Sequence, residues 1–267
     1  MSDTLQEEAP ARPSSGGFGP AMIKVVRVLG WTFIWTGLFL LGFVFHQLYV
    51  TTWFAQQGND QLAAEAEVYF EDAVITEVPY SPTGSPGGSE DPQPGDPNEP
   101  SDPAEPSQPS DPEDPQFLLV EEAPPSGQPF AIIRIPTIER LELGWTVVEG
   151  VSRANLKNGA GHMPSTPLPG QPGNSVISGH RTTYGAPFHE LEELQPGQTI
   201  EVDTALGTHV YEVRERIVVR PTELWVTGDR PGSWLTLTTC HPKFSSRQRL
   251  IVFAELVDGP NHDVIFG

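Results

Sequence analysis

The sequence contains one cysteine, Cys240, among its 267 residues. A single thiol cannot form a disulfide within the chain, so disulfide bridges do not hold this protein together. The sequence also shows no cluster of metal-ligating residues, since Glu190, Glu192 and Glu193 are read as a solvated loop and not as a calcium site. We therefore expect neither a metal nor a cofactor.

Positive charge is missing from a long part of the chain. Residues 28–133 hold 17 Asp and Glu and no Lys or Arg, whereas residues 130–267 hold 12 Lys and Arg against 15 Asp and Glu. The net charge of −20 thus belongs mainly to one segment. No basic patch is available to neutralise phosphates, so nucleic acid is not an expected partner.

One uncharged hydrophobic run, Val28 to Val50, follows Lys24 and Arg27. About 20 apolar residues span a bilayer core, and an upstream positive charge places the N-terminus in the cytoplasm. A cleaved signal peptide is the nearest alternative, but the run is longer than usual and offers no small-residue cleavage site. We predict a disordered cytoplasmic segment 1–20, an uncleaved signal anchor 21–50, and an extracellular remainder attached to the cell membrane by a single pass.

The next 79 residues are predicted to lie outside the folded domain. Residues 51–78 show helical spacing and are acidic, which suggests a juxtamembrane stalk. Residues 79–129 form an acidic Pro-rich linker, in which every third residue from Pro94 to Pro115 is proline. Glycine is absent from the third positions, which excludes collagen, whereas polyproline II matches the period and would extend roughly 68 Å. The alternatives are a semi-rigid spacer and a solvated, unstructured chain.

Residues 130–267 carry the folded domain, in which seven or eight short strands are expected. The predicted strands are Phe130–Pro136, Thr146–Glu149, Ser175–His180, Thr199–Val202, His209–Val213, Arg216–Arg220, Ser233–Cys240 and Arg249–Leu256. A loop is expected over Asn158–Asn174 and a helical turn over Phe188–Leu194. Many strands with little helix indicate an all-β antiparallel barrel or sandwich.

Cys240 ends its predicted strand just before Pro242, which cannot donate to a sheet. A free cysteine is often only a small buried hydrophobe, but a thiolate with a partner base is a nucleophile. His180 also ends a predicted strand, and it is the histidine best placed to meet Cys240 at one rim. Arg249 begins the following strand and could supply donors to an oxyanion, with Arg247 as the alternate.

These residues resemble the sortase family, most closely its class E members. The resemblance covers roughly residues 130–257 and is carried by the segments Leu237–Cys240, Ser178–Arg181, Leu168–Gly170, Gly173–Asn174 and Cys240–Pro242, together with Arg249. Class D sortases share much of this pattern. The resemblance implies a closed eight-stranded β-barrel and a cysteine transpeptidase.

In such an enzyme Cys240 would attack the Thr–Gly bond of an LPXTG or LAXTG sorting signal and form a thioacyl enzyme. His180 would protonate the leaving amine and deprotonate the acceptor, and Arg249 would steady the substrate or oxyanion. Tyr184, Thr239 and His241 are candidate substrate-binding residues. The implied partners are secreted proteins that carry a sorting signal, and an acceptor amine from a peptidoglycan precursor or a pilin lysine.

Two other functions fit the same residues. A cysteine peptidase would hydrolyse the thioacyl enzyme instead of transferring it. A tethered envelope-binding module would carry Cys240 only as a structural residue. Ligation to a supplied amine separates the first from a transferase, and slow alkylation of Cys240 would indicate the second.

Overall fold

The computed structural model describes residues 20–46, 51–81 and 116–267, and for 51–55 the backbone only. The chain divides into two compact units, residues 1–50 and 51–267. In the first unit, helix α1 (Pro20–Phe45) has no buried residue and is long and apolar enough to cross a membrane. The predicted anchor is therefore a helix of suitable length and composition.

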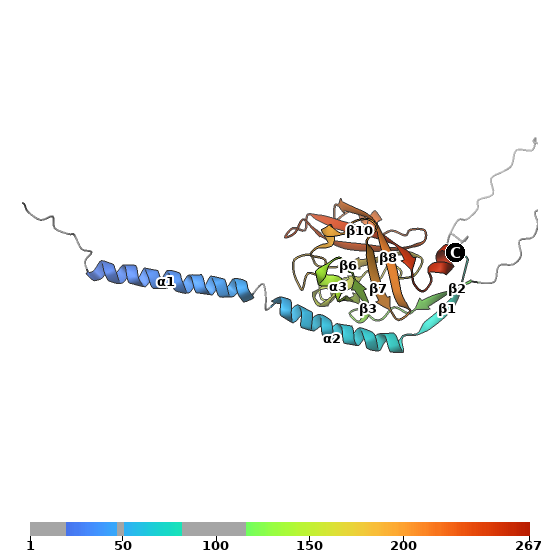
Figure 1. Ribbon diagram of the computed structural model, residues 1–267, viewed down its shortest axis with the longest axis horizontal. Helices are drawn as coiled ribbons and strands as arrows, with labels where there is room; N and C mark the ends of the chain where they lie inside the picture. Colours follow the sequence, from blue (N-terminus) through green and yellow to red (C-terminus); the bar gives the residue numbers. More distant parts are fainter. Residues whose placement is uncertain (1–19, 47–50, 82–115) are drawn as a thin grey trace, which may run out of the picture. The chain divides into compact units, whose positions relative to one another are not determined.

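The second unit is built on a closed β-barrel with strand order β10-β8-β7-β3-β4-β5-β6-β9 (Figure 1). Its strands are β3 (Pro129–Arg134), β4 (Trp145–Glu149), β5 (Ala160–His162), β6 (Gly173–Ser178), β7 (Thr199–Thr204), β8 (Gly207–Val219), β9 (Ser233–His241) and β10 (Gln248–Asp258). Short helical pieces connect them: α3 (Glu139–Glu142), α4 (Asn155–Asn158), η2 (Leu191–Glu193), η3 (Leu224–Thr227) and the C-terminal α5 (His262–Phe266). The predicted all-β, eight-stranded barrel is confirmed.

Alternating side chains from these strands fill the barrel with aliphatic and aromatic groups. Fully buried members include Phe130, Ile133, Ile177, Ile200, Tyr211, Leu235, Leu237 and Val252. Leu235 and Leu237, which the alternation on β9 assigned to the buried face, are both 0% exposed. This packing fixes the position of β9 in the barrel and hence of the cysteine near its end.

Three details of the barrel differ from the sequence prediction. The pairs β4–β5 and β6–β9 are parallel, so the sheet is mixed and not wholly antiparallel. Strand β5 lies inside the predicted loop 158–174. The sequence did not reveal this strand, because three residues that include a glycine show no clear alternation. Strands predicted at 209–213 and 216–220 are one strand, β8, whose register against β10 shifts between Val213 and Glu215. This β-bulge interrupts the alternation without ending the strand.

Helix α2 (Thr51–Asp72) packs on the barrel, where the sequence suggested a stalk. The Asn59 side chain accepts a hydrogen bond of 2.8 Å from the Thr146 backbone N–H on β4, and Ala66 is 0% exposed. Farther along, the Tyr69 hydroxyl donates to the Glu122 carbonyl at 2.7 Å. The helical spacing thus identified a buried face of a helix that belongs to the folded domain.

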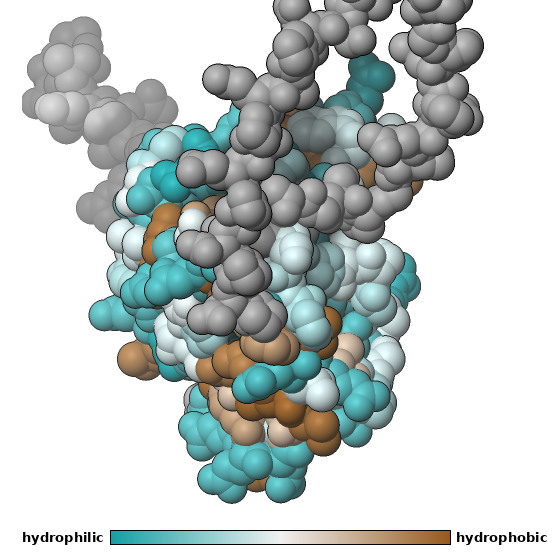
Figure 2. Space-filling view, turned by 90° about the vertical axis from the view of Figure 1, so that its right-hand side faces the viewer, coloured by the Kyte–Doolittle hydropathy of each residue, from teal (hydrophilic) through white to brown (hydrophobic). Residues whose placement is uncertain are grey.

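Strand β1 (Ile75–Tyr80) pairs antiparallel with β2 (Gln116–Glu121), and Tyr80 stands opposite Gln116. Backbone groups of Leu119 in β2 are bound by the side chains of Gln171 and Asn261 at 2.8 to 2.9 Å. Figure 2 faces the side on which β1 and β2 lie in Figure 1, and a hydrophobic patch interrupts a largely hydrophilic surface there. The exposed apolar residues of β1, of β2 and of the position just before β1 are Val74, Ile75, Val78 and Phe117.

This pairing bears on the predicted linker. The repeat from Pro94 to Pro115 lies outside the described residues, but the residues at 80 and 116 on either side of it face each other across one ladder. Since α2 precedes it and packs on β4, the repeat is not the connection between α1 and the barrel. The compact unit that contains the barrel thus begins at residue 51, and strand β2 lies within the segment predicted as linker, 79–129.

Replacing Asn59 with Ala should destabilise this unit by about 2 kcal/mol, because the buried Thr146 N–H loses its acceptor. Urea unfolding of the full-length chain in detergent, followed by circular dichroism, measures this loss. Gln57→Ala, at an exposed position on the same helix, is the matched control. Equal stabilities of the two variants would show that α2 contributes nothing through this contact.

Glu121, at the end of β2, is a buried carboxylate that is 3% exposed. Burial raises the pKa of Glu121 to about 7, against a smaller lowering by the hydrogen bond from the Ala205 backbone N–H. The folded protein therefore holds this proton more tightly than the unfolded chain. The stability that the protonated form gives is complete below pH 4.5 and is lost as the pH rises to about 7.

Glu121→Gln should accordingly raise the free energy of unfolding at pH 8 by about 2 kcal/mol and change it little at pH 4.5. The amide keeps an acceptor for Ala205 and removes the buried charge. Urea unfolding at both pH values tests this, with exposed Glu122→Gln as the control. A gain of the same size at both pH values would mean that ionisation of Glu121 is not its cause.

Candidate active site

Cys240 and His180 stand at the same end of two neighbouring strands. Strands β6 and β9 run parallel, with Ser178 opposite Thr238, so the next residues of both chains leave the ladder together. The Gly179 N–H donates to the Thr238 carbonyl at 3.1 Å, and the Thr239 hydroxyl donates to the Gly179 carbonyl at 2.7 Å. These bonds extend the register to the residue before His180.

The two side chains line one open pocket of about 370 Å³. Its other lining residues come from the segment after β6 and from the β9–β10 connection: Arg181, Thr182, Thr183, Phe244, Ser245 and Ser246. Cys240 is a free, half-buried thiol. A thiol and an imidazole, the side chains of a nucleophile and a base, thus share a cavity that is open to a substrate.

Burial governs the chemistry of His180. Its Nε2 atom is buried and has no hydrogen-bond partner among the described residues, and desolvation lowers the pKa of its imidazole below the usual 6.5. At neutral pH the ring is therefore uncharged and able to accept a proton. The Tyr184 ring packs against it with 5.0 Å between centroids.

Arg249 stands opposite Cys240 on β10, as the hairpin predicted. Its Nη1 donates to the carbonyls of Ser246 and Gln248 at 3.0 and 3.1 Å, and Arg249 is not among the residues that line the pocket of Cys240. Arg247, the alternate, lines a neighbouring pocket of about 880 Å³ that also contains Arg220 and Phe244. The register brings Arg249 to the site, while its guanidinium is bound to the β9–β10 connection.

The three candidate substrate-binding residues occupy different environments. Tyr184 is 48% exposed, whereas Thr239 is 3% exposed with its hydroxyl bound to Gly179. The Nδ1 atom of His241 accepts a hydrogen bond from Arg181 Nη1, 3.2 Å away. Of the three, only Tyr184 presents a largely exposed side chain.

Arg181 is a site residue that the sequence argument named only within a longer segment. It is 3% exposed and donates to the carbonyls of Cys240 and His189 at 3.1 and 3.2 Å. It also forms an ion pair with Glu192, which pairs with Lys243 as well. This buried guanidinium ties the segment after β6 to the end of β9. Its position directly after His180 was the signal that could have identified it.

The described residues contain no group of three or more His, Cys, Asp or Glu side chains placed to hold a metal ion. Two further histidines, His162 and His209, are buried elsewhere in the barrel. His162 contacts Glu149 Oε2 at 2.7 Å, and His209 is 0% exposed. Neither lines the pocket of Cys240.

Comparison with known proteins gives a consistent result. The sequence model of the sortase domain matches residues 133–257. Sortase SrtE1 of Streptomyces coelicolor is 33% identical over 148 residues, which cover 49% of this chain and 41% of that protein. The structure of sortase E from Streptomyces avermitilis is 35% identical, covering 52% of this chain and 94% of that one, with a TM-score of 0.45. The chain belongs to the sortase family.

Sortase D of Bacillus subtilis is also similar, with 31% identity over 145 residues that cover 54% of this chain and 65% of the relative. The chain thus spans about two fifths of SrtE1 and just under two thirds of sortase D. Sortases are cysteine transpeptidases, and this chain is a class E-like member. Helix α2 and strands β1 and β2 lie outside the matched residues.

Proposed function

We propose that this sortase is a membrane-anchored extracellular transpeptidase that cleaves an LPXTG or LAXTG sorting signal between Thr and Gly. It then transfers the threonine acyl group from the thioester to an amine of a cell-wall precursor. The observation that carries this proposal is the shared pocket of the Cys240 thiol and the His180 imidazole. Acyl transfer through a thioester requires a nucleophile and a proton carrier within reach of the same carbonyl.

In the first half-reaction, neutral His180 accepts the thiol proton as the Cys240 sulfur attacks the threonine carbonyl. The tetrahedral intermediate collapses when the C–N bond breaks, and the His180 imidazolium gives its proton to the departing glycine amine. The carboxyl side of the threonine remains as a thioester on Cys240. Burial of His180 favours this order of steps, because it keeps the imidazole neutral, with one ring nitrogen free to accept the thiol proton.

In the second half-reaction, an acceptor amine enters and His180 removes one of its protons. The amine attacks the thioester, an amide bond forms, and the C–S bond breaks to regenerate the thiol. Arg249 is assigned to the oxyanion or to the substrate backbone. Its Nη1 is bound to the β9–β10 connection, and its other N–H groups are left as donors.

The membrane layout follows from α1 and the charges beside it. Lys24 and Arg27 precede the central part of the helix, and residues 28–133 contain no positive charge. We assign the N-terminus to the cytoplasm and the barrel to the outside. Secreted proteins carrying sorting signals are the donors, and a peptidoglycan-precursor amine or a pilin lysine is the acceptor.

A transfer assay tests the proposal. The full-length chain in detergent is mixed with a fluorescent LPXTG or LAXTG peptide, with and without an excess of a small primary amine. We expect an amide product whose mass equals the threonine-terminated fragment plus the amine, less one water. Cleavage that yields only the free acid, even at high amine concentration, would identify a hydrolase instead.

A further inference from the structure

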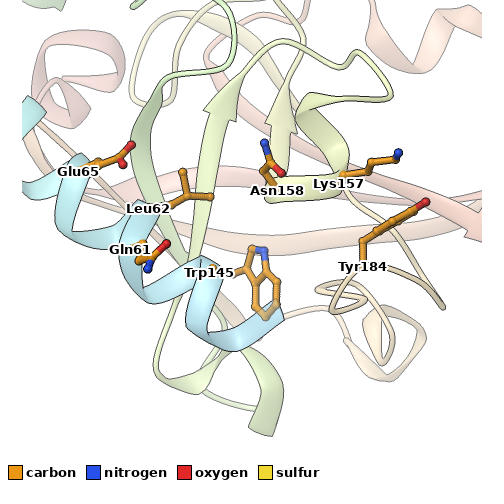
Figure 3. A pocket seen from close by; sticks show the side chains of 8 residues that line it. Gln61, Leu62, Glu65, Trp145, Lys157, Asn158 and Tyr184 are labelled. Carbon is orange, nitrogen blue, oxygen red and sulfur yellow. The ribbon is translucent and has the colours of Figure 1, made fainter. Parts of the chain in front are cut away.

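A second pocket, of about 290 Å³, lies between helix α2 and the barrel (Figure 3). Gly58, Gln61, Leu62 and Glu65 of α2 form one wall, and Trp145, Lys157, Asn158 and Tyr184 form the other. The wall on α2 belongs to the segment outside the sortase match. A cavity of this size accommodates a group no larger than an amino acid or a short peptide.

The barrel side of the pocket offers unused hydrogen-bond donors. Trp145 is 4% exposed, and its buried indole N–H has no partner in the part of the chain that the structure describes, a costly state for a donor. Lys157 forms no ion pair with any residue that the structure describes, and Figure 3 shows it beside Asn158 across the pocket from α2. A ligand with negatively charged oxygens would satisfy the lysine and the indole together.

The opposite wall limits the charge of that ligand. Glu65 projects from α2 on the far side of the pocket from Lys157 (Figure 3). Its carboxylate repels polyanions such as polyphosphates and favours a ligand that also carries a positive group. The wall composition therefore matches a zwitterionic, amino-acid-like unit.

Tyr184 connects this pocket to the proposed catalytic base. The Lys157 ammonium lies 5.6 Å from the centroid of the Tyr184 ring, and that ring lies 5.0 Å from the His180 ring. Tyr184, Gly185 and Ala186 all have positive φ. This backbone conformation is unfavourable for Tyr184 and Ala186, and such strain is found mainly at functional sites. A carboxylate held by Lys157 would thus place a neighbouring amine on the side of His180.

We propose that this pocket binds the acceptor, and that the acceptor is an amine whose carbon also bears a carboxylate. The inference rests on the proposed transpeptidase function and adds the chemical class of the second substrate. The carboxylate also distinguishes the acceptor amine from the leaving amine. The leaving glycine amine sits on a carbon followed by an amide, which lacks the charge that Lys157 selects.

The test compares alanine with ethylamine, which is alanine without its carboxylate, as acceptors for the full-length chain. Thioacyl formation is first established with either sorting peptide by capture with hydroxylamine. Lys157→Gln should then lower kcat/KM for alanine about tenfold and leave the value for ethylamine unchanged, because only alanine offers the charge. Trp145→Phe should show the same selectivity with a smaller loss, and Arg153→Gln, exposed and outside the pocket, should change neither value.

The rate of hydroxylamine capture must stay at the wild-type value in Lys157→Gln, which shows that Cys240 and His180 are intact. Equal losses with both acceptors, or no loss with either, would overturn the acceptor pocket while leaving the transpeptidase in place. Absence of any hydroxylamine product from the wild-type chain would overturn the proposed function, and this inference with it.

Discussion

Replacing Cys240 with Ala is expected to abolish cleavage and transfer, with a fall of more than about 10³-fold in rate. The thiol is the only sulfur nucleophile in the chain, and no neighbouring group in its pocket can form a thioester in its place. Cleavage of a fluorescent sorting peptide measures the loss. Cys240→Ser should be nearly as inactive, because a hydroxyl is a much weaker nucleophile at neutral pH.

The same substitution should change the free energy of unfolding by less than about 1 kcal/mol, since Cys240 is half-buried at the mouth of the pocket and not part of the core. Unfolding measured alongside activity separates a lost nucleophile from a lost fold. Activity within tenfold of the wild type in Cys240→Ala would end the thioester mechanism. A variant that unfolds would instead support the alternative of a structural cysteine.

Replacing His180 with Gln should lower the rate by about 10²- to 10⁴-fold, the usual contribution of a general acid and base. Glutamine fills much of the same space but cannot carry a proton between the thiol and the departing amine. His262→Gln, on the C-terminal helix α5, is the matched control and should retain full activity. Steady-state cleavage and transfer rates measure both effects.

The pH profile adds a second readout for His180. Burial lowers the pKa of this imidazole, so it stays neutral down to pH values below 6.5. The wild-type rate should therefore hold as the pH falls to 6.5 and decline only below it, as protonation removes the base. This acidic limb should disappear in His180→Gln. An unchanged limb in that variant would assign it to another group.

The sequence predicted most of the barrel because its strands alternate clearly. Leu235 and Leu237 marked the inner face of β9, and Pro242 marked its end. The parallel pairing of β6 with β9 was not predictable in this way, since it joins segments whose contact depends on the closure of the whole barrel. The convergence of His180 and Cys240 followed from both residues standing at strand ends.

The N-terminal part was predicted less well. The spacing of Leu62, Ala66 and Tyr69 identified a helix, but nothing local showed that its apolar face docks on the barrel. Strand β2 was assigned to the linker because acidic, Pro-rich sequence surrounds its short apolar run. Its partner, β1, lies 35 residues earlier, so the pairing depends on a contact that no local pattern reveals.

These corrections change how the tether is understood. Residues 46–50 are all that separates α1 from α2 in the sequence, and α2 belongs to the folded unit. Helix α2, which precedes the sortase match, thus contributes one wall of the pocket that Trp145 and Lys157 also line. Substrate selection and attachment would then share one segment.

The central claim is that Cys240 carries the substrate as a thioester, and intact mass measurement tests it most directly. The full-length chain is incubated with a sorting peptide, without an acceptor amine, and quenched in acid. We predict an adduct equal in mass to the peptide through its threonine less one water, mapped by proteolysis to Cys240 and absent from Cys240→Ala. An adduct on another residue, or cleavage of the peptide by Cys240→Ala, would contradict the account.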